Sequence, residues 1–294
     1  MSIECVKELK DKYIEYRDTL NLSKKITFGV EIEYENVLNS LVTHELKKLN
    51  ITNWTNKTEV DIREYTDCFK EMNGEIVSPI LIDSKETWKN LKKILEMLNG
   101  KNAIITNKCG GHVNIGIQIF ENNLEYYKKF LYAWMFYSIY IRRFSTGDFD
   151  KLRNFKDTHF NPVIFNPESN MTGSVYGFNP CLFDKHHEIY IHVQNGIESI
   201  YDDRIEFRIP NGTLDPSIFQ NYINFFAKFI IACKNIDREE IIYKIKKNKN
   251  SLNDLLDFTF DNELDKENFK IQYYKINEYY RKKHNNHIFR YKDN

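Results

Sequence analysis

Three short segments of the chain alternate strictly between apolar residues and charged or polar ones. They are residues 26–35, 110–116 and 204–209. Side chains two residues apart lie on the same face of a β-strand. If the strands share a sheet, one face carries Glu31 and Glu33, His112 and Asn114, and Arg204, Glu206 and Arg208. Carboxylates, an imidazole and guanidiniums together suit divalent cations and phosphates. The simpler alternative is an antiparallel sheet whose polar face meets water.

Glycines stand directly beside these charged positions. Gly29 precedes the first pair of glutamates, and Gly110 and Gly111 precede His112. Glycine weakens a strand unless a ligand or another backbone approaches closely. The glycines therefore favour a ligand site over a solvated polar face.

Length and composition limit the class of protein. The chain has 294 residues, enough for one large domain or two small ones. Its content of 41% hydrophobic and 15% aromatic residues excludes a disordered chain. The 42 basic and 42 acidic residues give a formal net charge of zero. We therefore expect neither nucleic acid nor a membrane surface as a partner. The composition indicates no oligomeric state.

The cysteines and the apolar segments favour a cytoplasmic protein. No Cys-x-x-Cys pair occurs among Cys5, Cys68, Cys109, Cys181 and Cys233, so a disulfide framework is not expected. The N-terminus lacks a hydrophobic signal core, and the most apolar run, residues 130–141, is too short to span a bilayer. Cys109 stands three residues before His112, which suggests a nucleophile pair or half a zinc site, but a small core residue is the commoner outcome.

The remaining periodicity predicts an α+β fold. It indicates helices over 3–21, 84–100, 123–145 and 215–234, a strand over 74–81, and an ordered loop or lid over 147–185. Hairpin-like and helical connections are mixed, so we expect a largely antiparallel sheet with helices packed on its back. The predicted organisation is an N-terminal helical segment (1–25), a catalytic domain (26–235) and a C-terminal helical extension (236–294).

Taken in order, four motifs carry a family resemblance. They read Gly-Val-Glu-Ile-Glu, Gly-Glu-Ile-Val-Ser-Pro, Cys-Gly-Gly-His-Val-Asn and Arg-Ile-Glu-Phe-Arg-Ile-Pro-Asn-Gly. Over roughly residues 26–232 this series resembles the putative amidoligases, a branch of the carboxylate–amine ligases that includes glutamine synthetase and glutamate–cysteine ligase. The resemblance implies a curved, glutamine synthetase-like sheet and an ATP-dependent ligase.

The resemblance also implies roles for individual residues. Metal ligands would be Glu31, Glu33, Glu75, His112 and Glu206. Catalytic contacts to phosphate or to the bound carboxylate substrate would come from Arg204 and Arg208, with Glu206 between them, and further nucleotide contacts from Arg142, Arg143 and Asn179. The implied cofactors are ATP and Mg²⁺, with two ions expected and Mn²⁺ as a substitute.

The implied reaction joins a carboxylate to an amine. ATP would convert the carboxylate of an amino acid, peptide or peptide-like substrate into an acyl phosphate, and an amine would displace phosphate to form an amide or isopeptide bond. Two alternatives stay open: an ATP-dependent phosphotransferase, and an inactive module that binds peptides or nucleotides. The family usually has a second histidine where this chain has Asn114, and residues 59–61 replace its Asp-Gly-Ser segment.

Overall fold

The computed structural model describes most of the chain. The described residues are 12–58, 71–106, 109–121, 123–145, 189–192, 204–247 and 250–283, without the side chains of 189–192 and 275–283. The strands are β1 (Thr27–Glu35), β2 (Thr55–Lys57), β3 (Asn73–Val77), β4 (Leu81–Ile82), β5 (Gly111–Gly116), β6 (Ile189–His192) and β7 (Arg204–Phe207). The helices are α2 (Asn39–Lys48), α3 (Lys85–Gly100), the 3₁₀ turn η2 (Gln118–Phe120), α4 (Leu124–Ser145), α6 (Pro216–Asn235), α7 (Arg238–Lys247), α8 (Leu252–Thr259) and α9 (Glu263–Lys283).

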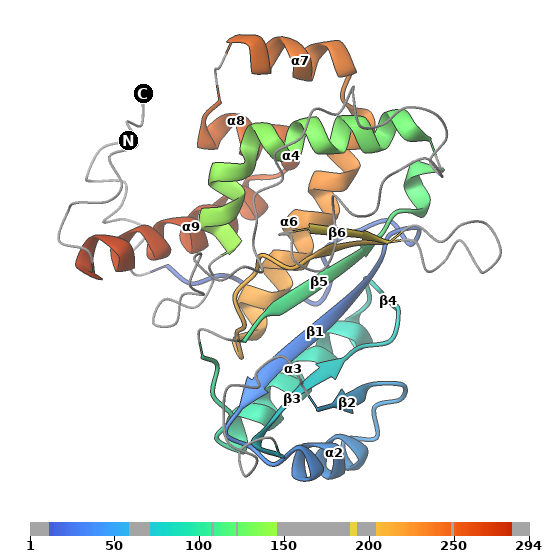
Figure 1. The fold of residues 1–294 in the computed structure, drawn as a ribbon, viewed down its shortest axis with the longest axis vertical. Coiled ribbons are helices and arrows are strands. Elements are labelled where there is room, and N and C mark those ends of the chain that lie inside the picture. The colour runs from blue at the N-terminus through green and yellow to red at the C-terminus, as the bar shows by residue number, and fades with distance from the viewer. Residues whose placement is uncertain are drawn as a thin grey trace.

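In the described part of the chain, seven strands form one open sheet in which every pairing is antiparallel (Figure 1). The order is β2-β3-β1-β5-β7-β6, and the short β4 pairs with the first two residues of β1. The prediction of an α+β fold with a largely antiparallel sheet is confirmed. The central position of β1 matters because its neighbours on both sides bring further polar residues to the same face.

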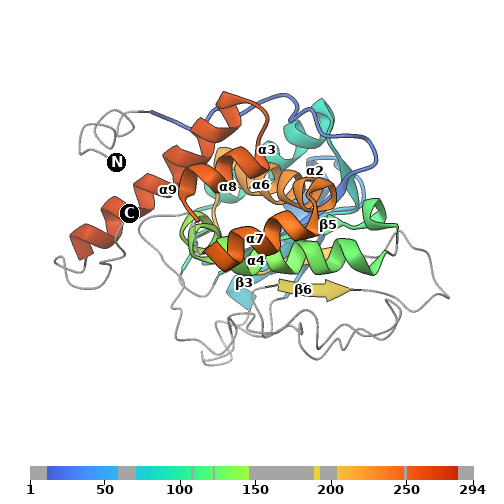
Figure 2. The same ribbon diagram turned by 90° about the horizontal axis from the view of Figure 1, so that it is seen from above.

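The two faces of the sheet differ in what covers them. Phe28, Val30 and Ile32 of β1 are buried on one face, and the helices gather on one side of the sheet (Figure 2). On that side Trp88 of α3 stacks on Phe28 with ring centroids 5.2 Å apart. The alternation that was visible in the sequence thus separates a hydrophobic core from the opposite, polar face.

Local sequence explains where the two helices next to the sheet begin. The Ser84 side chain accepts a hydrogen bond from the backbone N–H of Thr87 at 3.2 Å and caps α3. Asp215 caps α6 in the same way through the N–H of Ser217 at 2.8 Å, and Pro216 occupies the first helical position. Both helices were predicted with these starts.

Helix α4 lies between the sheet and the outer helices. Trp134 packs 5.4 Å from Phe207 of β7, measured between ring centroids, and Phe144 stacks 4.1 Å from Phe269 of α9. Because α4 has protein on both sides, its apolar residues point in nearly all directions, as the sequence indicated. None of the helices in the described residues is long and apolar enough to cross a membrane.

The segment after residue 236 is helical, as predicted, and shares the core of the rest of the chain. Ile241 of α7, Leu255 of α8 and Phe269 of α9 are fully buried in one continuous cluster with residues of the sheet. The division of the chain at residue 235 stays a prediction.

The helix predicted over 3–21 is wrong in its described part. From residue 12 to residue 26 the chain has no helix. Its backbone groups bond to distant side chains instead: Gln220 of α6 bonds both the N–H and the C=O of Arg17, each at 2.8 Å, and Asp83 accepts two further N–H groups. These partners replace the intrahelical hydrogen bonds that a helix would have supplied.

The sequence also left two elements undetected. Helix α2 and strand β2 occupy a stretch whose periodicity was mixed. The acidic segment 59–64 and the loop 147–185, both singled out in the sequence, lie outside the described residues.

A buried carboxylate joins the N-terminal segment to the last helix. Asp265 of α9 is fully buried and accepts hydrogen bonds from Arg17 at 2.7 Å, Asn224 at 2.8 Å, Asn262 at 2.5 Å and the ammonium of Lys228. Burial by itself would raise the pKa of this carboxyl, but the hydrogen bonds and the two cations hold the pKa below its ordinary value of 3.8. Asp265 therefore stays ionised at neutral pH.

We expect Asp265→Asn to lower the free energy of unfolding by about 3–5 kcal/mol, because two cations are left without their buried counter-charge. The pKa of Asp265 is lower in the folded protein than in the unfolded chain. The stabilisation by ionised Asp265 is therefore complete above its pKa in the unfolded chain, and it is lost as the pH falls through its pKa in the folded protein. Urea unfolding should therefore show a constant difference between wild type and variant from pH 7 to 5 and a smaller one below about pH 4.

Asp257→Asn is the matched control, because its ion pair with Lys266 is on the surface. It should leave the free energy of unfolding nearly unchanged. Equal effects of the two substitutions would contradict the role of Asp265.

Candidate functional site

The strand register brings the predicted polar residues onto one face. Glu33 of β1 lies opposite Glu75 of β3, and Glu31 lies opposite His112 of β5. On the other side of β5, Asn114 lies opposite Glu206 and Gly116 opposite Arg204 of β7. Four strands that are distant in sequence therefore contribute to a single polar surface, which we call the polar face.

Hydrogen bonds join the central members of the polar face into a chain. Glu31 contacts His112 Nδ1 through Oε2 and accepts from Asn114 Nδ2 through Oε1, both at 3.0 Å. Asn114 Oδ1 in turn accepts from Arg204 Nε at 3.0 Å. The sequence placed Asn114 on the charged face and marked it as a departure from the family pattern. In the structure its amide links a carboxylate to a guanidinium, donating through Nδ2 and accepting through Oδ1.

A backbone N–H group holds the carboxylate of Glu33 in place. Its side chain is 5% exposed and Oε2 accepts the N–H of Gly110 at 2.5 Å. Gly110 bridges to Asn211, and a Cβ on Gly111 would lie 2.8 Å from the carbonyl oxygen of Asn211. The glycines before His112 are thus needed for a close backbone approach, which delivers the N–H to Glu33.

A second carboxylate on this face is neutralised by an arginine. Glu206 is 4% exposed, accepts from Arg208, and lies 3.6 Å from His112 Nδ1 through Oε1. Burial alone would lower the pKa of Arg208, but the negative charges of Glu206, Glu31 and Glu33 raise it above its ordinary value. Arg208 is therefore a permanent cation within reach of an anionic ligand.

Three side chains of the polar face lie close enough together to hold a metal ion. One ligand atom each from Glu31, Glu75 and His112 lie within 4.8 Å of one another. His112 Nε2 is buried without a hydrogen-bond partner and lies 3.5 Å from Glu33 Oε1. Two atoms that bind one ion at about 2.1 Å lie roughly 3.0–3.4 Å apart. The unsatisfied nitrogen and the neighbouring carboxylates therefore fit a divalent cation.

Charge also favours a cation at this place. Glu31, Glu33, Glu75 and Glu206 face two guanidiniums, which leaves two negative charges if His112 is neutral. Burial would raise the pKa of Glu31, but hydrogen bonds from His112 and Asn114 and the charges of His112 and Arg208 hold it at about 2. Even with His112 counted as a cation, as it is in this lowering of the Glu31 pKa, four carboxylates face three cations, and a metal ion would offset the charge that remains.

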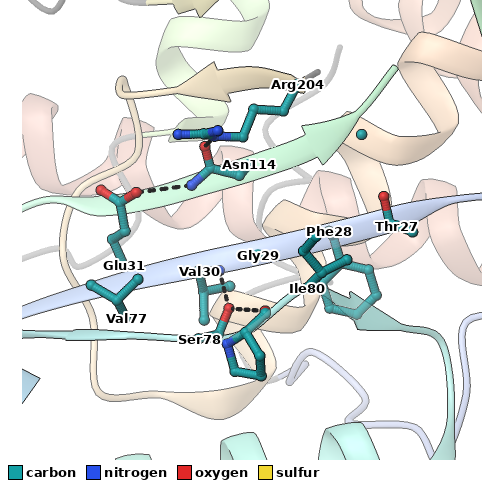
Figure 3. A pocket seen from close by; sticks show the side chains of 12 residues that line it. Thr27, Phe28, Gly29, Val30, Glu31, Val77, Ser78, Ile80, Asn114 and Arg204 are labelled. Carbon is teal, nitrogen blue, oxygen red and sulfur yellow. Dashed lines mark hydrogen bonds between the residues drawn. The ribbon is translucent and has the colours of Figure 1, made fainter. Parts of the chain in front are cut away.

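A pocket of about 220 Å³ opens beside Glu31 (Figure 3). Glu31, Asn114 and Arg204 stand on one side of β1, joined by the hydrogen bonds described above, and Val77 and Ile80 lie on the other side. No direct signal for this pocket is visible in the sequence. It depends on the pairing of β1 with the turn between β3 and β4, where Ser78 Oγ accepts the N–H of Val30 at 2.9 Å and donates to the carbonyl of Pro79 at 2.8 Å.

Three further residues were predicted as nucleotide contacts: Arg142, Arg143 and Asn179. Arg143, near the end of α4, donates to Tyr273 Oη of α9 at 2.8 Å. Arg142 precedes it on the same helix. A nucleotide contact by either arginine stays a prediction, and Asn179 lies outside the described residues.

Cys109 does not act as a nucleophile in this arrangement. It is fully buried, and burial together with the charges of Glu33 and Glu35 raises the pKa of its thiol to about 12. The thiol is therefore protonated at neutral pH. Three interpretations were weighed in the sequence, namely a nucleophile, half a zinc site and a small core residue, and the complete burial of Cys109 favours the last.

We expect the protein to bind Mn²⁺ and Glu31→Gln to weaken that binding by more than about tenfold, since a neutral amide replaces an ionised ligand. The measurement is an isothermal titration with MnCl₂ without nucleotide. Glu45→Gln on α2 is the control, because its carboxylate pairs with Lys48 and Lys101 outside the polar face. An unchanged affinity in Glu31→Gln would exclude the proposed ligand set.

Comparison with known proteins places the chain in a family. A family model described as "putative amidoligase enzyme" matches residues 24–230, more than half of the chain. The match spans β1 to most of α6 and so includes every strand that contributes to the polar face. A comparison with curated proteins gave no match. The chain belongs to the amidoligase family, and its family is one of ligase enzymes.

Proposed function

We propose that the protein is an ATP- and Mg²⁺-dependent carboxylate–amine ligase with a sheet of the glutamine synthetase type. The observation that carries the proposal is the cluster of Glu31, Glu75 and His112 beside the Arg208–Glu206 pair, in a chain of the amidoligase family. Metal ligands and a permanent cation on one surface are what a nucleotide triphosphate requires. The substrates are a carboxylate and an amine on amino acids, peptides or similar molecules.

The reaction consists of two displacements. An oxygen of the substrate carboxylate attacks the γ-phosphorus of ATP, the bond to the β,γ-bridging oxygen breaks, and ADP leaves. The amine nitrogen then attacks the acyl carbon, loses a proton, and expels inorganic phosphate. The products are an amide, ADP and phosphate, and no redox partner is needed.

The chain contributes mainly binding and orientation. The carboxylates of Glu31, Glu33 and Glu75 with His112 would hold Mg²⁺. When bound, Mg²⁺ would neutralise charge on the phosphates and align the γ-phosphoryl group. Phosphoryl transfer of this kind depends on positioning and charge neutralisation, so the absence of a reactive nucleophile at Cys109 is consistent with the proposal.

The two arginines would act on the anionic groups of the substrates. Arg208 is held against Glu206, and a guanidinium presents several donors, so it can contact phosphate while it keeps this bond. Arg204 is oriented by Asn114 and lines the pocket beside Glu31. It is thus suited to the carboxylate that receives the phosphoryl group.

An isotope experiment tests the proposed reaction by following a carboxylate oxygen of the acid into inorganic phosphate. Purified protein is given Mg²⁺-ATP, hydroxylamine as the amine, and a pool of carboxylic acids labelled with ¹⁸O. We expect hydroxamates to form and one ¹⁸O atom to appear in each inorganic phosphate, because an acyl phosphate transfers its carboxylate oxygen. A phosphorylated product without hydroxamate would indicate a phosphotransferase, and no use of ATP would indicate an inactive binding module.

In this assay Glu33→Gln should lower turnover by at least about 100-fold, because it removes a charge next to the metal and the transferring phosphate. Its control is Glu35→Gln on the same strand, whose carboxylate accepts from Thr106 at 2.9 Å. We expect the control to keep turnover within a few-fold of wild type. Full activity of Glu33→Gln would contradict the proposed role.

A further inference from the structure

Two glycines are among the residues that line the pocket beside Glu31. On the polar face of β1 the residue next to Glu31 is Gly29. Gly116, the last residue of β5, also lines the pocket. A Cβ on Gly116 would lie 2.1 Å from Thr27 Oγ1, so that position is filled by its neighbours. A Cβ on Gly29 would lie 3.4 Å from Ser78 Oγ and 3.7 Å from Asn114 Cβ, at ordinary contact distance. The hollow therefore exists because residue 29 has no side chain.

The two ends of the pocket differ in chemistry. One end is charged and consists of Glu31, Asn114 and Arg204, next to the metal ligands. Val77 lies opposite Glu31 on β3, and farther along the pocket the wall is apolar and includes Pro79 and Ile80. Ile80 is 59% exposed, so the apolar end opens toward solvent. A ligand that fills the pocket would carry an anionic group at one end and an uncharged body at the other.

The volume limits the size of that body. A cavity of about 150 Å³ accommodates benzene, so a pocket of about 220 Å³ suits a group of roughly nine non-hydrogen atoms. An amino acid such as valine has roughly eight, whereas the nucleoside part of ATP has roughly 19 and would extend out through the open end. The size favours a small acid over the adenosine of the nucleotide.

We propose that this pocket holds the body of the carboxylate substrate, a small acid with an uncharged, largely apolar side chain. Its carboxylate lies at the end formed by Glu31 and Arg204, next to the proposed metal ion, and its side chain lies against Pro79 and Ile80. Gly29 sets the size limit, and Ile80 disfavours a negative charge at the far end. This inference rests on the proposed ligase function, since it names the acid that is activated.

The test is a size series of acids. Acetate, propionate, isobutyrate, L-alanine, L-valine, L-phenylalanine and L-glutamate are each supplied with Mg²⁺-ATP and hydroxylamine, and hydroxamate is measured. We expect wild type to prefer uncharged acids up to about the size of valine and to use L-glutamate poorly. Gly29→Val should lower kcat/KM for valine by more than tenfold and for acetate by less than threefold. Gly29→Ala should give an intermediate profile.

A nucleotide-binding measurement distinguishes the two candidate ligands of the pocket, the acid substrate and the nucleotide. Mg²⁺ with a non-hydrolysable ATP analogue should raise the Tm of wild type and of Gly29→Val equally, which also shows that the variant is folded. Loss of the analogue's effect in Gly29→Val would place the nucleotide in the pocket and overturn the inference. An unchanged size profile in Gly29→Val would overturn it as well.

A pair of charge variants tests the apolar end. Ile80→Asp should lower kcat/KM for valine and leave acetate nearly unchanged, whereas Ile82→Asp should affect neither, because Ile82 is similarly exposed but does not line the pocket. Equal effects of the two would contradict the assignment. If wild type binds the analogue but uses none of these acids, the substrate class is wrong. If it neither binds the analogue nor consumes ATP, the ligase function itself is wrong.

Discussion

The structure depends on a concentration of negative charge on one face of its central strand. Glu31 and Glu33 stand two residues apart on β1, and the register adds Glu75 on one side and Glu206 beyond β5. Carboxylates this close repel each other unless protons or cations intervene. A proton is disfavoured at Glu31, whose pKa is held at about 2 by its hydrogen bonds and the neighbouring cations. The surroundings supply the guanidiniums of Arg204 and Arg208 together with His112, and the proposed metal ion would offset the negative charge that remains.

The opposite face of the same strand gives this arrangement its rigidity. Phe28, Val30 and Ile32 are buried in the core, where Trp88 of α3 stacks on Phe28 and α6 packs against the neighbouring strand β5, so β1 cannot rotate its carboxylates away from each other without exposing the core. The outer helices add a second layer over α4 and α6, and Asp265 joins the last helix to Arg17 and Lys228. The extension after residue 236 thus stabilises the helices that support the polar face.

The features that were predicted correctly from the sequence are those that period-two alternation, helix-capping residues and apolar patterning determine. The polar face of β1, the capped starts of α3 and α6, and the burial of α4 follow from local patterns, and the structure has all of them. The helix expected at the N-terminus failed because Gln220 and Asp83 bond its backbone, and such partners are not visible locally. The pocket was missed for the same reason, since it arises from the pairing of Gly29 with the turn at Ser78. The bridging role of Asn114 likewise required the register of β5 against β7.

The central claim is that the polar face binds a divalent metal together with nucleotide phosphates. The most direct measurement is a crystal structure with Mn²⁺ and a non-hydrolysable ATP analogue, with the metal located by its anomalous scattering. The account predicts an ion about 2.0–2.6 Å from atoms of Glu31, Glu75 and His112, in contact with the phosphates, with Arg208 beside them. An ion elsewhere, or a nucleotide bound away from this face, would contradict the account.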